Sequence, residues 1–340
     1  ARLDYFLISD PQSIAYCTGY YNDPHERMFV FMVSKHGNHT LFMNDLFYLE
    51  HDLDVNIVWH KDGQDAIQTI VDEMHFPGRI GIDKNWASHF LLDLMKKLPA
   101  AKYINASPCV DLVRMKKDLQ EQVLMIESSK INDAVMEEII PFIQEGVTEK
   151  QLAKKLDELF FNHHSTCYGA IVAFGKNAAD PHHENDDTPL RKGDCVLIDM
   201  GCVYKGYCSD MTRTFFYEGI LEEEIKVYEI VKKANEAAEA MIKPGVKLSD
   251  IDKCARKVIS DEGYGKYFTH RLGHFIGRDV HEYGDVSSVN EMEVEEGMIF
   301  SIEPGIYLEG NFGVRVEDLV MVTKDGCQVL NSFTKDIYII

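Results

Sequence analysis

The chain has 340 residues, of which 45% are hydrophobic, and its formal net charge is −21. This length is typical of about two domains. The acidic excess argues against a nucleic-acid partner or an anionic membrane surface. Because no run of 18 apolar residues occurs, we expect no membrane-spanning helix.

Cysteine usage and the start of the chain indicate the compartment. The eight cysteines contain no Cys-x-x-Cys pair and mostly lie among apolar residues, which is typical of buried free thiols in a reducing environment. The first ten residues lack a basic segment followed by a long apolar one, so no signal peptide is predicted. We therefore expect a cytoplasmic protein.

In chain order, the first part of the sequence alternates strands and helices. Apolar runs predict strands at residues 29–34, 39–43 and 79–83. Helical spacing of apolar residues predicts helices at 63–75 and 86–98. Residues 110–117 resemble a junction, so we expect one domain at 1–112 and a second at 113–340.

The second part of the chain contains an internal repeat. A long amphipathic helix at 119–144 is followed by a helix at 149–162, which begins with a capping box of Thr148 and Gln151. The same pattern recurs with helices at 222–241 and 250–262. Each pair precedes a strand-rich segment, which predicts two halves related by a pseudo-two-fold axis.

Two carboxylates follow the first helix pair. Asp199 lies in a buried-type strand at 196–201, and Asp210 lies on a predicted partner strand at 207–216. Carboxylates on paired strands can point to one side of a sheet. The plain alternative for either residue is an Asp bonded to turn amides.

Three further candidates follow the second helix pair. His274 lies in a segment dense in Gly and His, and Glu303 closes an apolar strand before a Pro-Gly turn. Glu317 lies on a predicted strand at 313–322, on the same face as Arg315. The alternative for His274 is a structural histidine, and the alternative for Glu317 is a surface ion pair with Arg315 on an edge strand. Because four clustered carboxylates repel one another, the set predicts a pair of divalent cations, which can activate water for hydrolysis.

Other motifs narrow the chemistry. The loop at 177–187 contains two His and four acidic residues, but they are too closely spaced for one rigid metal site, so we expect one functional histidine there, His182. The sequence contains no Gly-x-Ser-x-Gly, His-Glu-x-x-His or Gly-x-x-x-x-Gly-Lys motif. These absences exclude serine hydrolases with a nucleophile elbow, zincins and P-loop enzymes.

Four segments resemble the pita-bread metallopeptidases, which include methionine aminopeptidase, Xaa-Pro aminopeptidase and Xaa-Pro dipeptidase (prolidase): DMGCVYKGYCSDMTRTF, HRLGHFIGRDVHE, SIEPGIY and GVRVED. Residues 1–112 look like the N-terminal domain shared by prolidases, Xaa-Pro aminopeptidases and creatinase, and residues 19–27 look most like bacterial prolidases. The resemblance implies an α/β (α+β) fold, with an α/β N-terminal domain and a C-terminal pita-bread domain.

The resemblance also implies a role for each metal ligand. Asp199 would bind one metal ion through both oxygens, while Asp210 and Glu317 would bridge two ions. His274 and Glu303 would complete the second ion's ligands. The donor set is rich in oxygen, which favours Mn²⁺ over Zn²⁺, with Co²⁺ and Zn²⁺ as alternatives.

Three residues would take part in catalysis by the same resemblance: Glu303 as a proton carrier, with His182 and His281 contacting the substrate. The chain departs from the family pattern at Phe275, where Gly is usual, which would place bulk near the site. It also lacks an Arg shortly after His281. The substrate's carboxylate would therefore need a cation from elsewhere, and the candidates are Arg278, Arg315, His25 and Arg27.

These inferences together predict a two-metal peptidase that hydrolyses Xaa-Pro dipeptides as a homodimer. The loop at 23–27 is expected to approach the active site of the neighbouring subunit, the alternative being a solvated loop. The nearest rival is an Xaa-Pro aminopeptidase acting on longer peptides. A metal-free binding protein on the same fold is a more distant alternative, which the intact set of five ligands disfavours, as it does a creatinase-like enzyme without metal.

Overall fold

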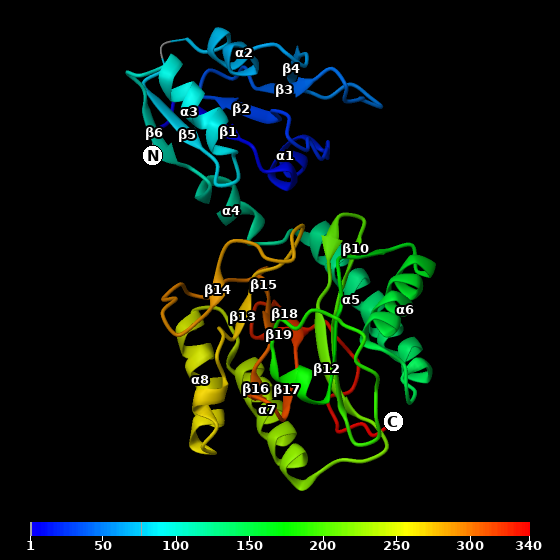
Figure 1. Cartoon of the computed structure of the whole chain (residues 1–340). Coiled ribbons are helices and arrows are strands. Elements are labelled where there is room, and N and C mark those ends of the chain that lie inside the picture. The colour runs from blue at the N-terminus through cyan, green and yellow to red at the C-terminus, as the bar shows by residue number, and fades with distance from the viewer. Residues whose placement is uncertain (1, 76) are drawn as a thin grey trace. The chain divides into compact units, whose positions relative to one another are not determined.

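The chain divides into two compact units, Ala1–Val113 and Arg114–Ile340, in this computed structural model, which describes residues 2–75 and 77–340 (Figure 1). Both units mix helices and strands, which confirms the predicted fold class. Within the described residues, no helix is both long and apolar enough to cross a membrane.

A six-stranded mixed sheet forms the centre of the N-terminal unit, in the order β4-β3-β2-β1-β5-β6. Its strands are β1 (Tyr5–Ile8), β2 (Val30–Ser34), β3 (Thr40–Asn44), β4 (Asn56–His60), β5 (Arg79–Ile82) and β6 (Lys102–Asn105). The helices are α1 (Pro11–Thr18), α2 (Ala66–Asp72), α3 (Ser88–Lys97) and α4 (Pro108–Arg114). The predicted strands at 29–34, 39–43 and 79–83 correspond to β2, β3 and β5, and the two predicted helices to shorter versions, α2 and α3.

Alternating side chains on β1 explain why this sheet is covered on both faces. Leu7 packs in one core cluster with Leu94 of α3, and Phe6 packs in another with Ile14 of α1. Side chains on a strand alternate between faces. The fully apolar strand β1 therefore requires helices on both sides.

The C-terminal unit contains the two predicted helix pairs. The first pair is α5 (Leu119–Ile139) and α6 (Glu149–Asn162), and the second is α7 (Glu222–Met241) and α8 (Leu248–Asp261). Helix α6 has the predicted capping box. Helix α5 ends five residues before the prediction, because Pro141 lies in the short helix η1 (Ile140–Phe142) and lacks the N–H that an α-helix requires.

Thirteen strands and two short helices complete this unit. The first half contains β7 (Thr166–Cys167), β8 (Ile171–Phe174), η2 (Gly175–Ala179), β9 (Cys195–Met200), β10 (Cys202–Tyr204), β11 (Tyr207–Cys208) and β12 (Met211–Phe216). The second half contains η3 (Gly265–Tyr267), β13 (Gly273–His274), β14 (Asp285–Val286), β15 (Ile299–Ile302), β16 (Gly305–Leu308), β17 (Phe312–Arg315), β18 (Asp318–Val322) and β19 (Cys327–Val329).

Equivalent backbone bonds confirm the internal repeat. The N–H of Gly146, just before α6, donates to Leu190 O at 2.9 Å, and the N–H of Gly245, just before α8, donates to Val294 O at 2.9 Å. Figure 1 shows α5 and α6 on one side of the central strands, and α7 and α8 on the other. The two halves therefore enclose the strands that carry the acidic residues.

The two predicted long strands, 207–216 and 313–322, are each broken in the middle, so this part of the prediction is wrong. Strand β11 pairs with β10 in one sheet, whereas the next strand, β12, pairs with β9 in another. Asp210 lies between β11 and β12. In the second half, β17 pairs with β16, whereas the next strand, β18, pairs with β15 in a different sheet. Glu317 lies between β17 and β18. Both carboxylates thus lie where a strand passes from one sheet to another.

The halves meet directly beside these breaks. The N–H of Glu317 donates to Thr212 O at 3.1 Å, and the hydroxyl of Thr214 donates to Arg315 O at 3.0 Å. Residues from the two halves are thereby held next to each other at the centre of the unit.

Candidate active site

A cavity of about 660 Å³ opens at the junction between the two halves of the C-terminal unit. It is lined by residues of both halves: Tyr168, Gly169, Ile171, Pro181, His182, Asp199, Asp210, His270, Arg271, His274, Val280, His281, Glu303, Arg315 and Glu317. All five predicted metal ligands, both predicted catalytic histidines and Arg315 are therefore brought to one place.

Each candidate ligand lies on or beside a short strand. Asp199 lies within β9, paired with Thr212 of β12, and His274 ends β13. Glu303 follows β15 directly, and its backbone N–H donates to Leu272 O at 2.8 Å. Backbone pairing on both sides of the cavity fixes the direction of these side chains before any ion binds.

His274 stands between carboxylates from both halves. Its Nε2 lies 3.6 Å from Asp210 Oδ2 and 3.6 Å from Glu303 Oε1. One ligand atom each of Asp210, His274 and Glu317 lies within 4.8 Å of the others. The Nδ1 of His274 is 3.2 Å from Phe275 O, and a proton shared there leaves the Nε2 lone pair directed at the carboxylates, as in metal-binding histidines.

The electrostatics of the cavity favour a bound cation. Burial, followed by the charges of Asp199 and Glu303, raises the pKa of Asp210 well above its usual value. Burial and Asp210 raise the pKa of Glu317 in the same way, and burial raises the pKa of Glu303 to about 7. Burial also lowers the pKa of His274 to about 3. Four carboxylates and a neutral imidazole therefore fit a divalent metal site, which would relieve the repulsion.

Arg315 fixes the wall behind Asp199. Its Nη2 donates to Asp199 Oδ2 at 2.8 Å, its Nη1 to the Tyr307 hydroxyl at 3.0 Å, and its Nε to Thr212 Oγ1 at 3.0 Å. The Tyr307 hydroxyl lies 2.8 Å from His270 Nε2. Burial lowers the pKa of His270 to about 4, so this imidazole is neutral and its Nε2 accepts a hydrogen bond from the Tyr307 hydroxyl.

Two of the other carboxylates accept hydrogen bonds from neutral hydroxyl groups. Thr212 donates to Glu317 Oε2 at 2.6 Å, and Ser301 donates to Glu303 Oε1 at 3.2 Å. Ser301 also accepts a hydrogen bond from the backbone N–H of His274 at 3.0 Å. Hydroxyl donors restrict the rotation of a carboxylate without neutralising it, so its charge remains for an ion.

The loop that carries His281 is held by a buried ion cluster. The ring of His281 lies edge-on to that of His274, with centroids 4.3 Å apart. The next residue, Glu282, accepts from Lys117 Nζ at 2.9 Å and from Arg114 Nη2 at 2.6 Å. Burial alone would raise the pKa of Glu282, but these two cations lower it to about 2.

Glu149 holds the loop that carries His182. Its Oε1 accepts from Phe174 N and Asn177 Nδ2, both at 2.9 Å, and its Oε2 contacts His183 Nε2 at 2.6 Å and Asp186 N at 3.0 Å. Glu149, His183 and Asp186 could geometrically hold an ion. Because the Glu149 carboxylate is already saturated by four partners, we interpret the cluster as a loop anchor.

Of the two predicted substrate residues in the C-terminal unit, Arg315 lines the cavity and Arg278 does not. Arg278 lies over the ring of Tyr207, 5.5 Å from its centroid. Arg27 binds Asp62 within the N-terminal unit through Nε and Nη2, each at 3.0 Å. His25, of the same unit, is exposed and has a φ of 50°. Arg315 lines the cavity, but its donors are directed to protein atoms.

Sequence reasoning missed several residues in and beside the cavity, among them Tyr168, His270, Arg271 and Tyr307. His270 and Arg271 lie in the His-dense segment and Tyr307 in the SIEPGIY string. The sequence thus indicated the segments but not which of their side chains face the cavity. The expectation that Phe275 places bulk at the site is wrong. Its buried ring packs against Phe300 at a centroid distance of 5.3 Å, and Phe275 does not line the cavity.

Four carboxylates and an imidazole gathered around one cavity are typical of metal-dependent hydrolases. The profile of metallopeptidase family M24 matches residues 123–324, and that of the creatinase/prolidase N-terminal domain matches residues 1–116. The chain belongs to metallopeptidase family M24, and it is a metallopeptidase.

Individual relatives agree over nearly the whole chain. An uncharacterized peptidase of Staphylococcus aureus is 35% identical over 98% of this chain and 96% of its own length. Two solved structures have TM-scores of 0.92: a dipeptidase from Pyrococcus horikoshii (35% identity, 99% of this chain and 96% of that one) and an Xaa-Pro dipeptidase from Bacillus anthracis (28%, 99% and 95%). An X-Pro aminopeptidase from Thermotoga maritima has a TM-score of 0.86 (29%, 99% and 98%).

Proposed function

We propose that this metallopeptidase hydrolyses Xaa-Pro dipeptides with two divalent metal ions held by Asp199, Asp210, His274, Glu303 and Glu317. The observation that carries the proposal is the convergence of these four carboxylates and one imidazole on a single cavity. The similarity to a dipeptidase and an Xaa-Pro dipeptidase over nearly the whole chain supports the substrate class.

The donor set also supports a choice of metal. Oxygen ligands predominate, which favours Mn²⁺, although Co²⁺ or Zn²⁺ could replace it. When bound, such ions neutralise the carboxylates and lower the pKa of water, which supplies the nucleophile for hydrolysis.

Three residues of the chain would move or donate protons. Glu303 lines the cavity, with its Oε1 3.6 Å from His274 Nε2, and would accept a proton from the attacking water and pass it to the leaving nitrogen. His281 and His182 both line the cavity. Each would donate a hydrogen bond to the substrate, and His281 would serve the oxygen on which negative charge develops.

The remaining walls of the cavity suit a prolyl residue with a free carboxylate. Ile171, Pro181 and Val280 are apolar and would contact the pyrrolidine ring, which offers no N–H to a polar wall. Arg271 lines the same cavity and is exposed. A guanidinium binds a carboxylate through two parallel hydrogen bonds, so we assign Arg271 to the substrate's C-terminus in preference to Arg278 or Arg315.

We also propose, from the sequence, that the protein is a cytoplasmic homodimer in which the loop at 23–27 approaches the partner's cavity. Arg27 is already bound to Asp62 and Glu26. The exposed imidazole of His25 is therefore the side chain of this loop that is better placed to meet a substrate. Sedimentation of the active enzyme and the kinetics of His25→Ala test this arrangement, and an active monomer would exclude it.

The proposal is tested by assaying Mn²⁺-dependent cleavage of Leu-Pro against Leu-Pro-Pro and Leu-Pro-Ala-Ala. Hydrolysis of Leu-Pro alone, lost on chelation and restored by Mn²⁺, is the expected result. Equal or faster cleavage of the longer peptides would make the enzyme an Xaa-Pro aminopeptidase, as the similarity to the Thermotoga maritima structure would allow. Full activity in thoroughly metal-stripped protein would refute the proposal.

A further inference from the structure

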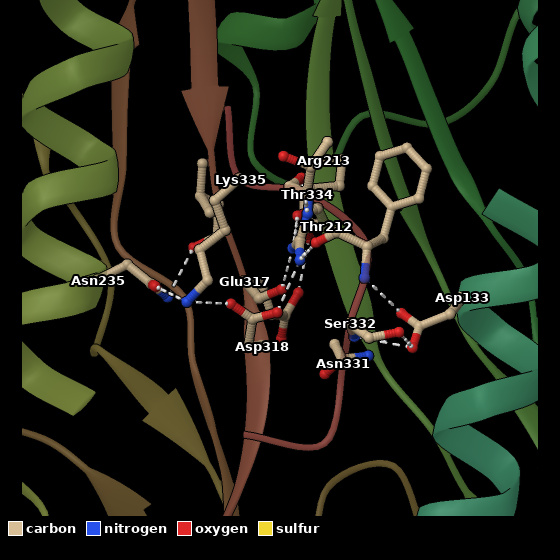
Figure 2. Close-up of polar contacts among 12 residues, drawn as sticks. Asp133, Thr212, Arg213, Asn235, Glu317, Asp318, Asn331, Ser332, Thr334 and Lys335 are labelled. Atoms are coloured by element: carbon tan, nitrogen blue, oxygen red, sulfur yellow. Dashed lines mark hydrogen bonds and ion pairs between the residues drawn. The ribbon is translucent and has the colours of Figure 1, made fainter. Parts of the chain in front are cut away.

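A short segment after β19, residues 331–335, contacts the backbone of one candidate metal ligand directly and is linked to two others through neighbouring side chains (Figure 2). The side chain of Asn331 donates from Nδ2 to Asp210 O at 3.3 Å and accepts at Oδ1 from Leu319 N at 2.7 Å. One amide thus joins the backbone of Asp210 to β18, the strand that begins immediately after Glu317.

Arg213 connects the same segment to Glu317. This side chain is 1% exposed, and its Nη1 donates to Glu317 O at 2.6 Å. Its other hydrogen bonds, each between 2.8 and 3.0 Å, go to Thr212 O, Asp318 Oδ1, Phe333 O and Thr334 O. All five N–H groups of the guanidinium therefore have acceptors, in a geometry that Lys could not reproduce.

Lys335 extends the network towards Glu303. Its Nζ lies 2.7 Å from Asp318 Oδ2 and 2.7 Å from Asn235 Oδ1. The Nδ2 of Asn235 in turn donates to Ile302 O at 2.9 Å, one residue before Glu303. Figure 2 shows Lys335 facing Asn235 and Asp318.

The segment itself is fixed to α5. The carboxylate of Asp133 accepts from the N–H of Ser332 at 2.8 Å, from the Ser332 hydroxyl at 2.7 Å and from the N–H of Phe333 at 3.1 Å. Figure 2 shows this contact on the opposite side of the segment from Lys335. Residues 331–335 are thus fixed to α5 in the middle, while Asn331 and Lys335 at the two ends link the segment to the backbone of the candidate ligands.

We propose that residues 331–335 form a positioning segment for the metal ligands, acting through Asn331 on Asp210, through Arg213 on Glu317 and through Lys335 on Glu303. This inference rests on the proposed function, because it takes these carboxylates to bind the ions. A fully hydrogen-bonded buried network has one preferred arrangement. Partners outside the ligand set typically change metal affinity by about 10- to 100-fold when they are lost.

Asn331→Asp is the sharpest test. It keeps the acceptor for Leu319 N but removes the donor to Asp210 O. A new acidic group by itself would attract cations, so weaker Mn²⁺ binding would have to come from a displaced ligand. The matched control is Asp336→Asn: Asp336 lies next to the segment, is 79% exposed and pairs with Lys232. Lys335→Met is the second variant.

Mn²⁺ affinity is measured by calorimetric titration of metal-free protein, together with the rise in Tm on adding Mn²⁺. We expect Asn331→Asp and Lys335→Met to bind Mn²⁺ about 10- to 100-fold more weakly and to show a smaller rise in Tm. The Asp336→Asn protein should behave as wild type. A segment with only a structural role would lower the Tm of the metal-free protein and leave Mn²⁺ affinity unchanged.

Two outcomes separate this inference from the proposed function. Wild-type affinity in Asn331→Asp, when wild-type protein itself binds Mn²⁺, overturns the positioning role and leaves the proposed function intact. Wild-type protein that binds no Mn²⁺ overturns both. If Lys335→Met does not fold, the Asn331→Asp result decides alone.

Discussion

Arg315 donates a hydrogen bond to Asp199 across the junction of the two halves, with 2.8 Å between Nη2 and Oδ2. Asp199 belongs to the first half and Arg315 to the second, so one charged pair both joins the halves and orients a candidate ligand. The other donors of this guanidinium bind Tyr307 and Thr212. The pair is therefore part of a wider network that shapes the cavity.

Loss of Arg315 should disturb Asp199 more than loss of Tyr307 does. We expect Arg315→Met to lower kcat/KM for Leu-Pro by about 10²-fold, since a small displacement of a positioned group has effects of this size. Tyr307→Phe, which keeps the Asp199 bond, should lower it less than tenfold. Steady-state kinetics at saturating Mn²⁺ measure both. Equal losses in the two variants would show that the Asp199 bond has no special role.

Asp210→Asn should abolish activity and leave the fold intact. Because burial and neighbouring carboxylates raise the pKa of Asp210, a neutral amide relieves repulsion in the metal-free protein. We expect at least about 10³-fold lower kcat and an unchanged or higher free energy of unfolding without metal. Urea denaturation and the Leu-Pro assay check the two parts. A strongly destabilised metal-free variant would contradict the electrostatic account.

Glu282 should stabilise the fold in a pH-dependent way. Lys117 and Arg114 lower its pKa from 4.5 to about 2. The side chain is 5% exposed, and the shift corresponds to about 3 kcal/mol. Because the folded-state pKa is the lower one, this stability is present above pH 4.5 and is lost as the pH falls towards 2.

The matching experiment compares wild type with Glu282→Gln by urea denaturation at several pH values. At pH 7 the variant should be less stable by about 3 kcal/mol, and the difference should shrink below pH 4.5. Its kcat should also fall, because the loop with His281 loses its anchor. A stability difference that does not depend on pH would argue against the ion cluster as its source.

His281→Ala should slow catalysis without removing metal. The ring lies edge-on to the candidate ligand His274, and we assign it to the substrate. Loss of one such donor typically lowers kcat by about 10²–10³-fold. Metal content, measured on the purified variant by elemental analysis, should remain at two ions per chain. Loss of an ion would make His281 a ligand.

Arg271→Met should raise KM for Leu-Pro with a smaller effect on kcat. The residue lines the cavity, and a guanidinium bound to the substrate carboxylate contributes mainly to binding. Arg278→Met is the matched control, since Arg278 lies against Tyr207 instead. The prediction fails if the control raises KM as much, or if Leu-Pro amide is cleaved as well as Leu-Pro.

The sequence predicted the helices of the repeat because apolar periodicity and the Thr148 cap are local signals. It did not predict the breaks at Asp210 and Glu317. Each break arises because the chain changes its partner strand, and partner strands are distant in sequence. The strands β1, β4 and β6 were also missed, although they are no shorter than the predicted strands β2, β3 and β5, because runs of four or five residues give little periodicity.

The candidate site could likewise be predicted only in part from the sequence. The residue types and order of the five candidate ligands were visible in the sequence, and the structure places all five around one cavity. The contacts of Arg27 with Asp62 and of Arg278 with Tyr207 could not be read from the sequence, because they join residues that are distant along the chain. Asn331 was missed because an isolated Asn carries no motif.

The most direct test of the metal centre is a crystal structure of the Mn²⁺-loaded protein with anomalous data collected at the manganese edge. The account predicts two peaks per chain within the cavity, surrounded by Asp199, Asp210, His274, Glu303 and Glu317. A peak at Glu149, His183 and Asp186, with none in the cavity, would contradict it.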